Sequence, residues 1–250
     1  MLLDREDLVG SLFFPRPDAG RCAPDAEDHL VPVVGGELHV RHHGVRCGAR
    51  ARTVLLFHGN GEIVSDWDPA AARFASLGWR FAVSDYRGYG RSTGVPTMRR
   101  LLEDARVVLA FLRGRTDGPL VVMGRSLGSA AAWEIAADPG VDALVIDSGF
   151  TDVAAFARRR GLDPTRLGEE EIEALDPIPK IARLEKPLLL LHGDADRVIA
   201  HREAERALAA SPAADAQLVT LRGRGHNDVS LDPSYWSALA ELLARCGREA

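Results

Sequence analysis

Six short apolar runs recur along the chain, and none shows the strict alternation of a strand with one exposed face. Each is five or six residues long. Runs of this kind are typical of strands that are covered on both faces of a parallel sheet. They are TVLLF (53–57), RFAVS (80–84), PLVVM (119–123), DALVI (142–146), PLLLL (187–191) and AQLVTL (216–221).

The chain before these runs has a different pattern. Residues 29–43, HLVPVVGGELHVRHH, alternate apolar and polar positions around Gly35-Gly36. Alternation on both sides of a glycine pair predicts an antiparallel hairpin with a tight turn.

Helical segments are predicted between the apolar runs. Two begin at Asp-Pro pairs, Asp68-Pro69 and Asp232-Pro233, because aspartate caps a helix and proline suits its first turn. Three others are predicted at 98–112, directly after Ser126, and at about 201–210. Strands that alternate with helices indicate an α/β fold with right-handed crossovers. The length of 250 residues suits one domain, 1–250.

Residues 150–186 interrupt this rhythm, because they contain no strand-like run. They carry the charged segments RRRG (158–161) and EEEIEAL (169–175), together with three prolines. We predict a small helical cap insertion, or a long excursion over the sheet edge, that is too short to form a domain of its own. The charged segments favour solvated helix faces, with an anion-binding role for the arginines as the alternative.

Charge and composition exclude several classes of function. The net charge of −5 leaves no basic footprint for nucleic acid or for a membrane surface. No apolar run approaches the roughly 20 residues of a membrane-spanning helix, and the first ten residues are too charged for a signal peptide. Cys22, Cys47 and Cys246 are odd in number and lack metal-ligand spacing. We therefore expect a cytoplasmic protein without a metal, a cofactor or an integral membrane segment.

The segment Gly124-Arg125-Ser126-Leu127-Gly128 joins a predicted buried strand to an alanine-rich helix. A serine at such an abrupt turn is strained and exposed at the carboxyl end of the sheet, and the flanking glycines avoid collisions. Ser126 could instead simply cap the helix. The combination of strand, elbow and helix favours Ser126 as a nucleophile.

A nucleophilic serine needs a base and an orienting carboxylate. His226 lies in the glycine loop GRGHND (223–228) between the last predicted strand and the last helix. Asp196, in LLLHGDADRVI (189–199), is the favoured carboxylate, with Asp194 and Asp147 as alternatives. The chain order is then Ser126, Asp196, His226.

The oxyanion formed by such a nucleophile needs hydrogen-bond donors that are already in place. We predict the backbone N–H of Leu127, at the start of the helix, and the backbone N–H of Asn60 in HGNGE (58–62). A phosphate-binding turn is the alternative for that loop, but neither GxGxxG nor GKS/T is present.

Taken together, LLFHGNGE, SDYRGYGRS, GRSLGS, LLHGDADRVI and GRGHND closely resemble the α/β-hydrolase superfamily and, more narrowly, the Bem46-like serine hydrolases. The resemblance covers nearly the whole chain and is weakest in 150–186. It implies a mostly parallel eight-stranded sheet covered by helices, a Ser-Asp-His triad, and hydrolysis of esters or thioesters without a cofactor.

The predicted function is therefore hydrolysis of small to medium carboxylic esters or thioesters through an acyl-enzyme. The alternatives are an acyltransferase or peptidase that uses the same triad, and a non-catalytic protein that binds a ligand with this fold. The predicted partner is a small-molecule acyl substrate.

Overall fold

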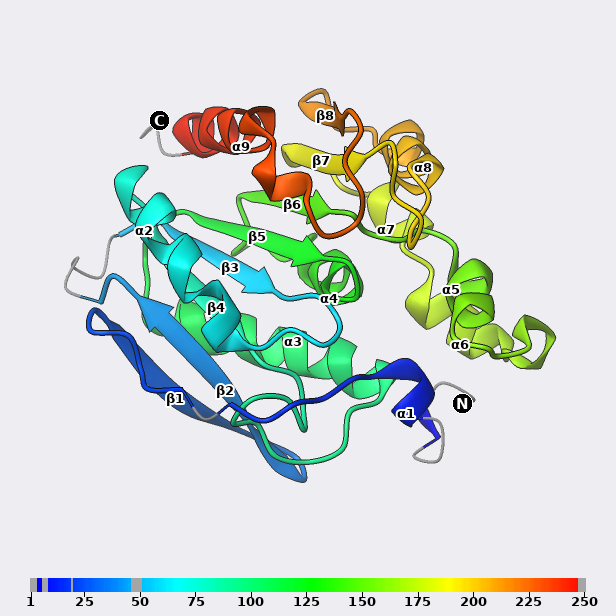
Figure 1. The fold of residues 1–250 in the computed structure, drawn as a ribbon, viewed down its shortest axis with the longest axis horizontal. Coiled ribbons are helices and arrows are strands. Elements are labelled where there is room, and N and C mark those ends of the chain that lie inside the picture. Colours follow the sequence, from blue (N-terminus) through cyan, green and yellow to red (C-terminus); the bar gives the residue numbers. More distant parts are fainter. Residues whose placement is uncertain (1–3, 6–8, 19, 46–50, 247–250) are drawn as a thin grey trace.

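The computed structural model describes residues 4–5, 9–18, 20–45 and 51–246. The described part contains one eight-stranded sheet, in the order β1-β2-β4-β3-β5-β6-β7-β8 (Figure 1). The pairs β1–β2 and β2–β4 are antiparallel and all other pairs are parallel. The strands are β1 (Ala26–Val33), β2 (Gly36–His43), β3 (Thr53–Phe57), β4 (Arg80–Ser84), β5 (Leu120–Arg125), β6 (Ala143–Asp147), β7 (Leu188–Gly193) and β8 (Ala216–Leu221).

The predicted fold class is confirmed, and each predicted strand is found. The hairpin closes through a two-residue loop, Val34-Gly35, because Val33 pairs with Gly36. Gly35 has φ 79°, a conformation that glycine adopts without steric cost. The hairpin begins three residues earlier than predicted, at Ala26.

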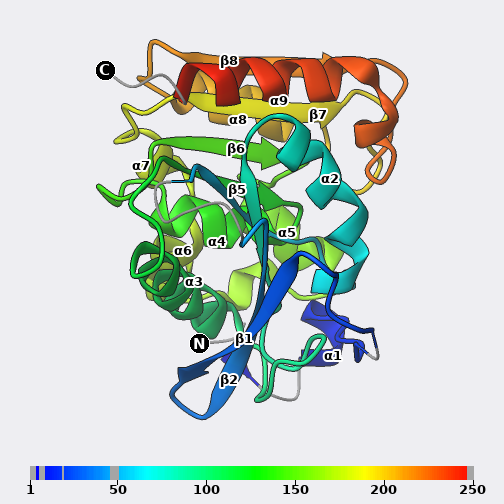
Figure 2. The same ribbon diagram turned by 90° about the vertical axis from the view of Figure 1, so that its left-hand side faces the viewer.

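Helices cover both faces of the sheet, as Figure 2 shows for α2 on one side and for α3 and α4 on the other. The apolar runs are continuous because alternate residues of a strand are buried on opposite faces of the sheet, as β3 shows. Val54 and Leu56 join a core with side chains of α2 and α9, whereas Leu55 and Phe57 join a core with side chains of α3 and α4. The helices are α1 (Val9–Leu12), α2 (Asp68–Ser76), α3 (Met98–Arg113), α4 (Gly128–Ile135), α5 (Val153–Arg159), α6 (Glu169–Leu175), α7 (Ile178–Ile181), α8 (Arg202–Ala210) and α9 (Pro233–Cys246).

One of the two predicted aspartate caps is wrong. Asp232 behaves as expected, since its carboxylate accepts the N–H of Ser234 at 3.0 Å. Asp68 does not cap α2, because that helix continues directly from a 3₁₀ turn at Val64–Trp67. The Asp68 carboxylate lies 2.9 Å from the guanidinium of Arg41 instead. Arg41 is fully buried, so its need for a carboxylate outweighs the cap.

Residues 150–186, all of which the structure describes, form α5, a 3₁₀ turn at Pro164–Arg166, α6 and α7, and contain no strand. Figure 1 shows α5 and α6 beyond the carboxyl ends of the central strands. The assignment of this segment as a cap over a single domain stays a prediction.

The strand order makes the connections diverge at the carboxyl ends of β3 and β5. From β3 the chain crosses to β4 on one side, and it later returns to β5 on the other side of β3. The helices α2 and α4 therefore leave neighbouring strands toward opposite faces of the sheet. Ligand sites in open α/β sheets lie at such a divergence.

The start of α4 packs against the end of β3 without clearance. A Cβ atom on Gly128 would lie 2.0 Å from the carbonyl oxygen of Phe57. A Cβ atom on Gly124 would lie 2.6 Å from the Cβ of Ala132. The two glycines thus allow β5, the elbow and α4 to pass beside β3.

We expect Gly128→Ala to destabilise the protein by about 3 kcal/mol, because backbone atoms rather than a flexible side chain would have to move. Urea denaturation at neutral pH measures this change. Gly114→Ala is the control, since its Cβ would meet its nearest atom at an ordinary 3.5 Å. Equal stability of the two variants would contradict the packing described.

Candidate active site

Ser126 lies at the tip of the elbow with φ 51°, in a left-handed conformation that is rare for a residue other than glycine. Its N–H donates to the carbonyl of Asp147 at 2.9 Å, and its carbonyl accepts the hydroxyl of Ser129 at 2.7 Å. Bonds on both sides of the residue hold the strained backbone in place. The residue is only 6% exposed, so the structure shows the predicted strain but not the predicted exposure to solvent.

His226 reaches Ser126 from the loop between β8 and α9. Its Nε2 atom lies 2.9 Å from the Oγ of Ser126. The loop is fixed against the end of β7, where the N–H of Ala195 donates to the carbonyl of Arg224 at 3.0 Å. Gly193 makes this approach possible, because a Cβ there would lie 2.1 Å from that same carbonyl oxygen.

Asp196 contacts the opposite side of the imidazole, with 2.7 Å between its Oδ2 and the Nδ1 of His226. Its other oxygen accepts the N–H groups of Val198 and Ile199 at 2.7 and 2.8 Å. Burial raises the pKa of the carboxyl, but hydrogen bonds from His192, His226 and Ile199 outweigh it and hold the pKa well below its usual range. A carboxylate at Nδ1 leaves Nε2 free to accept the serine proton.

The two alternative aspartates lie elsewhere. Asp194 accepts the N–H of Gly223 at 2.6 Å. Asp147 is buried beneath the elbow and accepts the hydroxyl of Tyr235 at 3.0 Å. The structure therefore brings together Ser126, His226 and Asp196, and neither alternative contacts the imidazole within the described residues.

The two predicted oxyanion donors lie on elements next to the elbow. Leu127 follows it at the start of α4, and Asn60 follows β3, the strand next to β5. Neither N–H is used in a hydrogen bond among the described residues. The side chain of Asn60 is anchored by three bonds. Its Oδ1 accepts the N–H of Phe14 at 2.9 Å and the hydroxyl of Tyr89 at 2.5 Å, and its Nδ2 donates to the carbonyl of Leu12 at 2.8 Å.

The sequence analysis missed a buried carboxylate that supports the loop carrying Asn60. Asp85 follows β4 and is 1% exposed. One oxygen lies 2.9 Å from Nδ1 of His39, and the other accepts the N–H of Val64 at 2.9 Å and lies 3.2 Å from Nε2 of His58. Asp85 thus ties β2, β4 and the loop after β3 together. Asp85 belongs to the segment SDYRGYGRS, which carries part of the family resemblance, but neither that segment nor its place directly after an apolar run indicates which groups it contacts.

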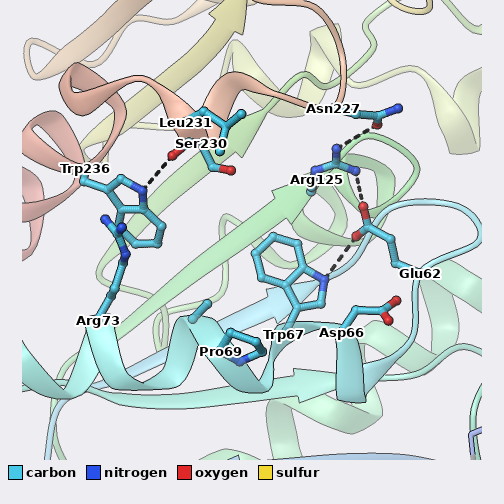
Figure 3. Close-up of a pocket in the computed structure, with 11 residues that line it drawn as sticks. Glu62, Asp66, Trp67, Pro69, Arg73, Arg125, Asn227, Ser230, Leu231 and Trp236 are labelled. Atoms are coloured by element: carbon cyan, nitrogen blue, oxygen red, sulfur yellow. Dashed lines mark hydrogen bonds and ion pairs between the residues drawn. The ribbon is translucent and has the colours of Figure 1, made fainter.

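A second missed group is Arg125, directly before the serine. Its buried guanidinium pairs with Glu62, beyond Asn60 in the loop after β3, and also contacts the loop that carries His226 (Figure 3). A variable position inside GxSxG gives no sequence signal for such contacts.

The arginines at 158–160 are not equivalent. Arg158 and Arg159 are exposed, as expected for a solvated helix face. The guanidinium of Arg160 instead lies over the rings of Phe14 and Phe156, at 5.1 and 5.5 Å from their centroids. It has no carboxylate partner among the described residues.

The described residues contain no group of three or more histidine, cysteine or acidic side chains arranged to hold a metal ion. Within the same part of the chain, no helix combines the length and the apolar character needed to cross a bilayer. Cys22 and Cys246 are free thiols, and Cys47 lies outside the described residues.

Known sequences that are similar to this chain indicate its family. The family model described as serine aminopeptidase, S33, matches residues 48–160. An uncharacterized protein of Mycobacterium tuberculosis, Rv2307c, is 30% identical over 87% of this chain and 78% of its own. The chain belongs to the α/β-hydrolase superfamily.

Two further relatives of this α/β hydrolase come from human and from Escherichia coli. Human alpha/beta hydrolase domain-containing protein 17B is 29% identical over 80% of this chain and 69% of its own length. The uncharacterized YfhR of Escherichia coli is 32% identical over 62% of this chain, and the match spans only 56% of YfhR.

Solved structures share the fold at low sequence identity. An esterase of Pyrococcus furiosus, Pf2001, superposes with a TM-score of 0.74 at 17% identity, over 92% of this chain and 98% of its own. A predicted CIB-like hydrolase of Thermoplasma acidophilum has a TM-score of 0.66 at 19% identity, over 88% and 98%.

The Asp85 network predicts a pH-dependent contribution to stability. Burial raises the pKa of Asp85, but hydrogen bonds from His39 and His58 lower it overall to about 2. Because the ordinary pKa of an aspartate is 3.8, this stabilisation is fully present above that pH and is lost as the pH falls through about 2. We expect Asp85→Asn to cost about 2 kcal/mol at pH 7 and progressively less in acid.

Urea denaturation of both proteins from pH 7 downward measures this difference. Asp117→Asn, at an exposed position, serves as the control. A gap between wild type and Asp85→Asn that stays constant down to the lowest pH would contradict the interpretation.

Proposed function

We propose that this α/β hydrolase cleaves small to medium carboxylic esters or thioesters through an acyl-enzyme formed on Ser126. The observation that carries the proposal is the unbroken chain of contacts from Asp196 to His226 to Ser126, with 2.7 and 2.9 Å between the bonded atoms. These distances match those needed for a base and its orienting group.

The reaction begins when Ser126 attacks the substrate carbonyl and gives its proton to Nε2 of His226. Asp196 holds the ring and stabilises its positive charge. The N–H groups of Leu127 and Asn60 stabilise the oxyanion, since both are free among the described residues. The alcohol or thiol leaves with the proton from His226. Water, activated by the same imidazole, then releases the acid.

We further propose that the chain falls within the Bem46-like serine hydrolases and functions in the cytoplasm. The five sequence segments described above support the narrower group, and the free thiols Cys22 and Cys246 suit a reducing compartment. The segment 150–186 would act as a cap, because α5 lies beyond the carboxyl ends of the strands (Figure 1).

Peptide cleavage is the second candidate, and it is favoured by the name of the matching family, serine aminopeptidase. Both reactions use the same nucleophile and base. An aminopeptidase also needs a free carboxylate for the substrate ammonium group. Glu62, close to Asn60 in the chain, does not offer one, because Arg125 neutralises it. Hydrolysis of 4-nitrophenyl butyrate compared with an aminoacyl 4-nitroanilide separates the two candidates.

We expect Ser126→Ala to lower kcat for 4-nitrophenyl butyrate by about 10⁴-fold or more, because no other group can form the acyl-enzyme. The variant should also lose covalent labelling by a fluorophosphonate probe. Ser76→Ala, on the exposed face of α2, is the control and should retain both. Substantial hydrolysis by folded Ser126→Ala would refute the proposed nucleophile.

The position of Arg160 predicts a preference for substrates with a negative charge. Its guanidinium lies over Phe14, whose backbone N–H donates to the side chain of Asn60, so this cation lies near the loop that carries one of the proposed oxyanion donors. We expect Arg160→Met to lower kcat/KM for a succinate monoester about tenfold, because a charge-assisted bond is lost, with little change for the neutral butyrate. Equal changes for the two esters would contradict this role.

A further inference from the structure

The guanidinium of Arg125 is a junction between segments that are far apart in the chain. One of its terminal nitrogens donates to the backbone carbonyl of His226 at 3.0 Å and to Oδ1 of Asn227 at 3.1 Å. The other terminal nitrogen is paired with Oε1 of Glu62. Its Nε lies 3.7 Å from the carboxylate of Asp147, and the side chain is 10% exposed.

Glu62 passes this contact on to the backbone beside Asn60. Its second oxygen accepts the N–H of Gly59 at 2.8 Å and the indole N–H of Trp67 at 3.1 Å. The carboxylate therefore bridges the turn that presents the N–H of Asn60. Arg125 is buried and Glu62 is half-buried, and an ion pair whose remaining donors and acceptors are satisfied in this way holds its geometry well.

We propose that Arg125 is a positioning residue that fixes the His226 loop and the Asn60 loop relative to Ser126. The proposal rests on the proposed hydrolase function. The planar guanidinium of Arg125 bonds to Glu62 and to the carbonyl of His226 at the same time. The backbone of Arg125 directly precedes Ser126, so these bonds fix both loops relative to the serine. A lysine supplies one point charge and cannot reproduce both directions.

A cavity of about 490 Å³ lies beside this junction and makes the proposal testable by chemical rescue. Glu62, Trp67, Arg73, Arg125 and Trp236 are among its lining residues (Figure 3). Truncation of Arg125 would leave a guanidinium-shaped space that joins this cavity. A free guanidinium ion of the same charge and shape could enter it and restore the contacts.

Arg73 provides the matched control in the same cavity. Its guanidinium stacks over Trp236 at 4.7 Å and forms no ion pair or hydrogen bond with the two loops among the described residues. Loss of Arg73 removes the same side-chain type from the same cavity without touching the junction.

Steady-state kinetics on 4-nitrophenyl butyrate test the role. We expect Arg125→Met and Arg125→Ala to lower kcat about 10- to 100-fold while KM changes less than about threefold, because misplacement affects the transition state more than substrate binding. Arg125→Lys should retain intermediate activity, and Glu62→Gln should show a smaller loss of kcat. Arg73→Met should retain wild-type kinetics.

Millimolar guanidinium chloride, far below denaturing concentrations, should raise kcat of Arg125→Ala with saturation. It should not raise kcat of wild type, of Arg73→Met or of Ser126→Ala. An equal concentration of sodium chloride controls for ionic strength, and thermal denaturation with and without guanidinium controls for stability. Restored stability without restored kcat would overturn the positioning role.

Wild-type hydrolysis and fluorophosphonate labelling are measured first, and their absence would refute the proposed function rather than this inference. With an active wild type, a folded Arg125→Met whose kcat stays within about twofold overturns the inference. If Arg125→Met and Arg125→Ala do not fold, the kcat values of Arg125→Lys and Glu62→Gln test the inference instead. Unchanged kcat in both would overturn it equally.

Discussion

The contact between Gly128 and the end of β3 is the constraint on which the site depends. With 2.0 Å between a hypothetical Cβ and the Phe57 carbonyl oxygen, α4 can begin at this point only if no side chain is present. The resulting proximity forces the chain to reverse within Ser126, at φ 51°, and brings the elbow beside the loop after β3. The strained backbone of Ser126 is thus a consequence of the close packing of Gly128 against β3.

Around this contact, the parts of the site come from loops, and buried charges hold those loops in place. Asp85 contacts His58 in the loop after β3, whereas Arg125 and Glu62 connect the same loop to the loop after β8. Asp196 is itself held by the backbone of Val198 and Ile199. Asp85, Arg125 and Asp196 are buried and Glu62 is half-buried, so removal of one partner would leave a poorly compensated charge. Rigid loops of this kind keep reacting atoms within bonding distance before any substrate arrives.

The predictable parts of the protein were those with a local signal. Apolar runs gave the strands, Gly35 gave the hairpin turn, and the elbow glycines together with chain order gave the three residues that meet. Long-range polar pairing had no such signal. Asp68 failed as a cap because Arg41, 27 residues away, binds its carboxylate. Arg125 and Glu62 are 63 residues apart, so their pairing depends on how β3 and β5 lie side by side.

The side chain of Asn60 extends the site toward the start of the described chain. It bonds to the backbone of Leu12 and Phe14. The segment that contains these two residues contributes no strand to the sheet, yet it stabilises the turn that follows β3. Pro17 continues this attachment through a bridge to Gly90. A shortened protein that began at Ala26 would keep every strand and all three side chains that meet at the elbow. It would nevertheless lose both backbone contacts of the Asn60 amide and keep only the bond from the hydroxyl of Tyr89. The length of chain that forms the sheet is therefore shorter than the length that holds this turn.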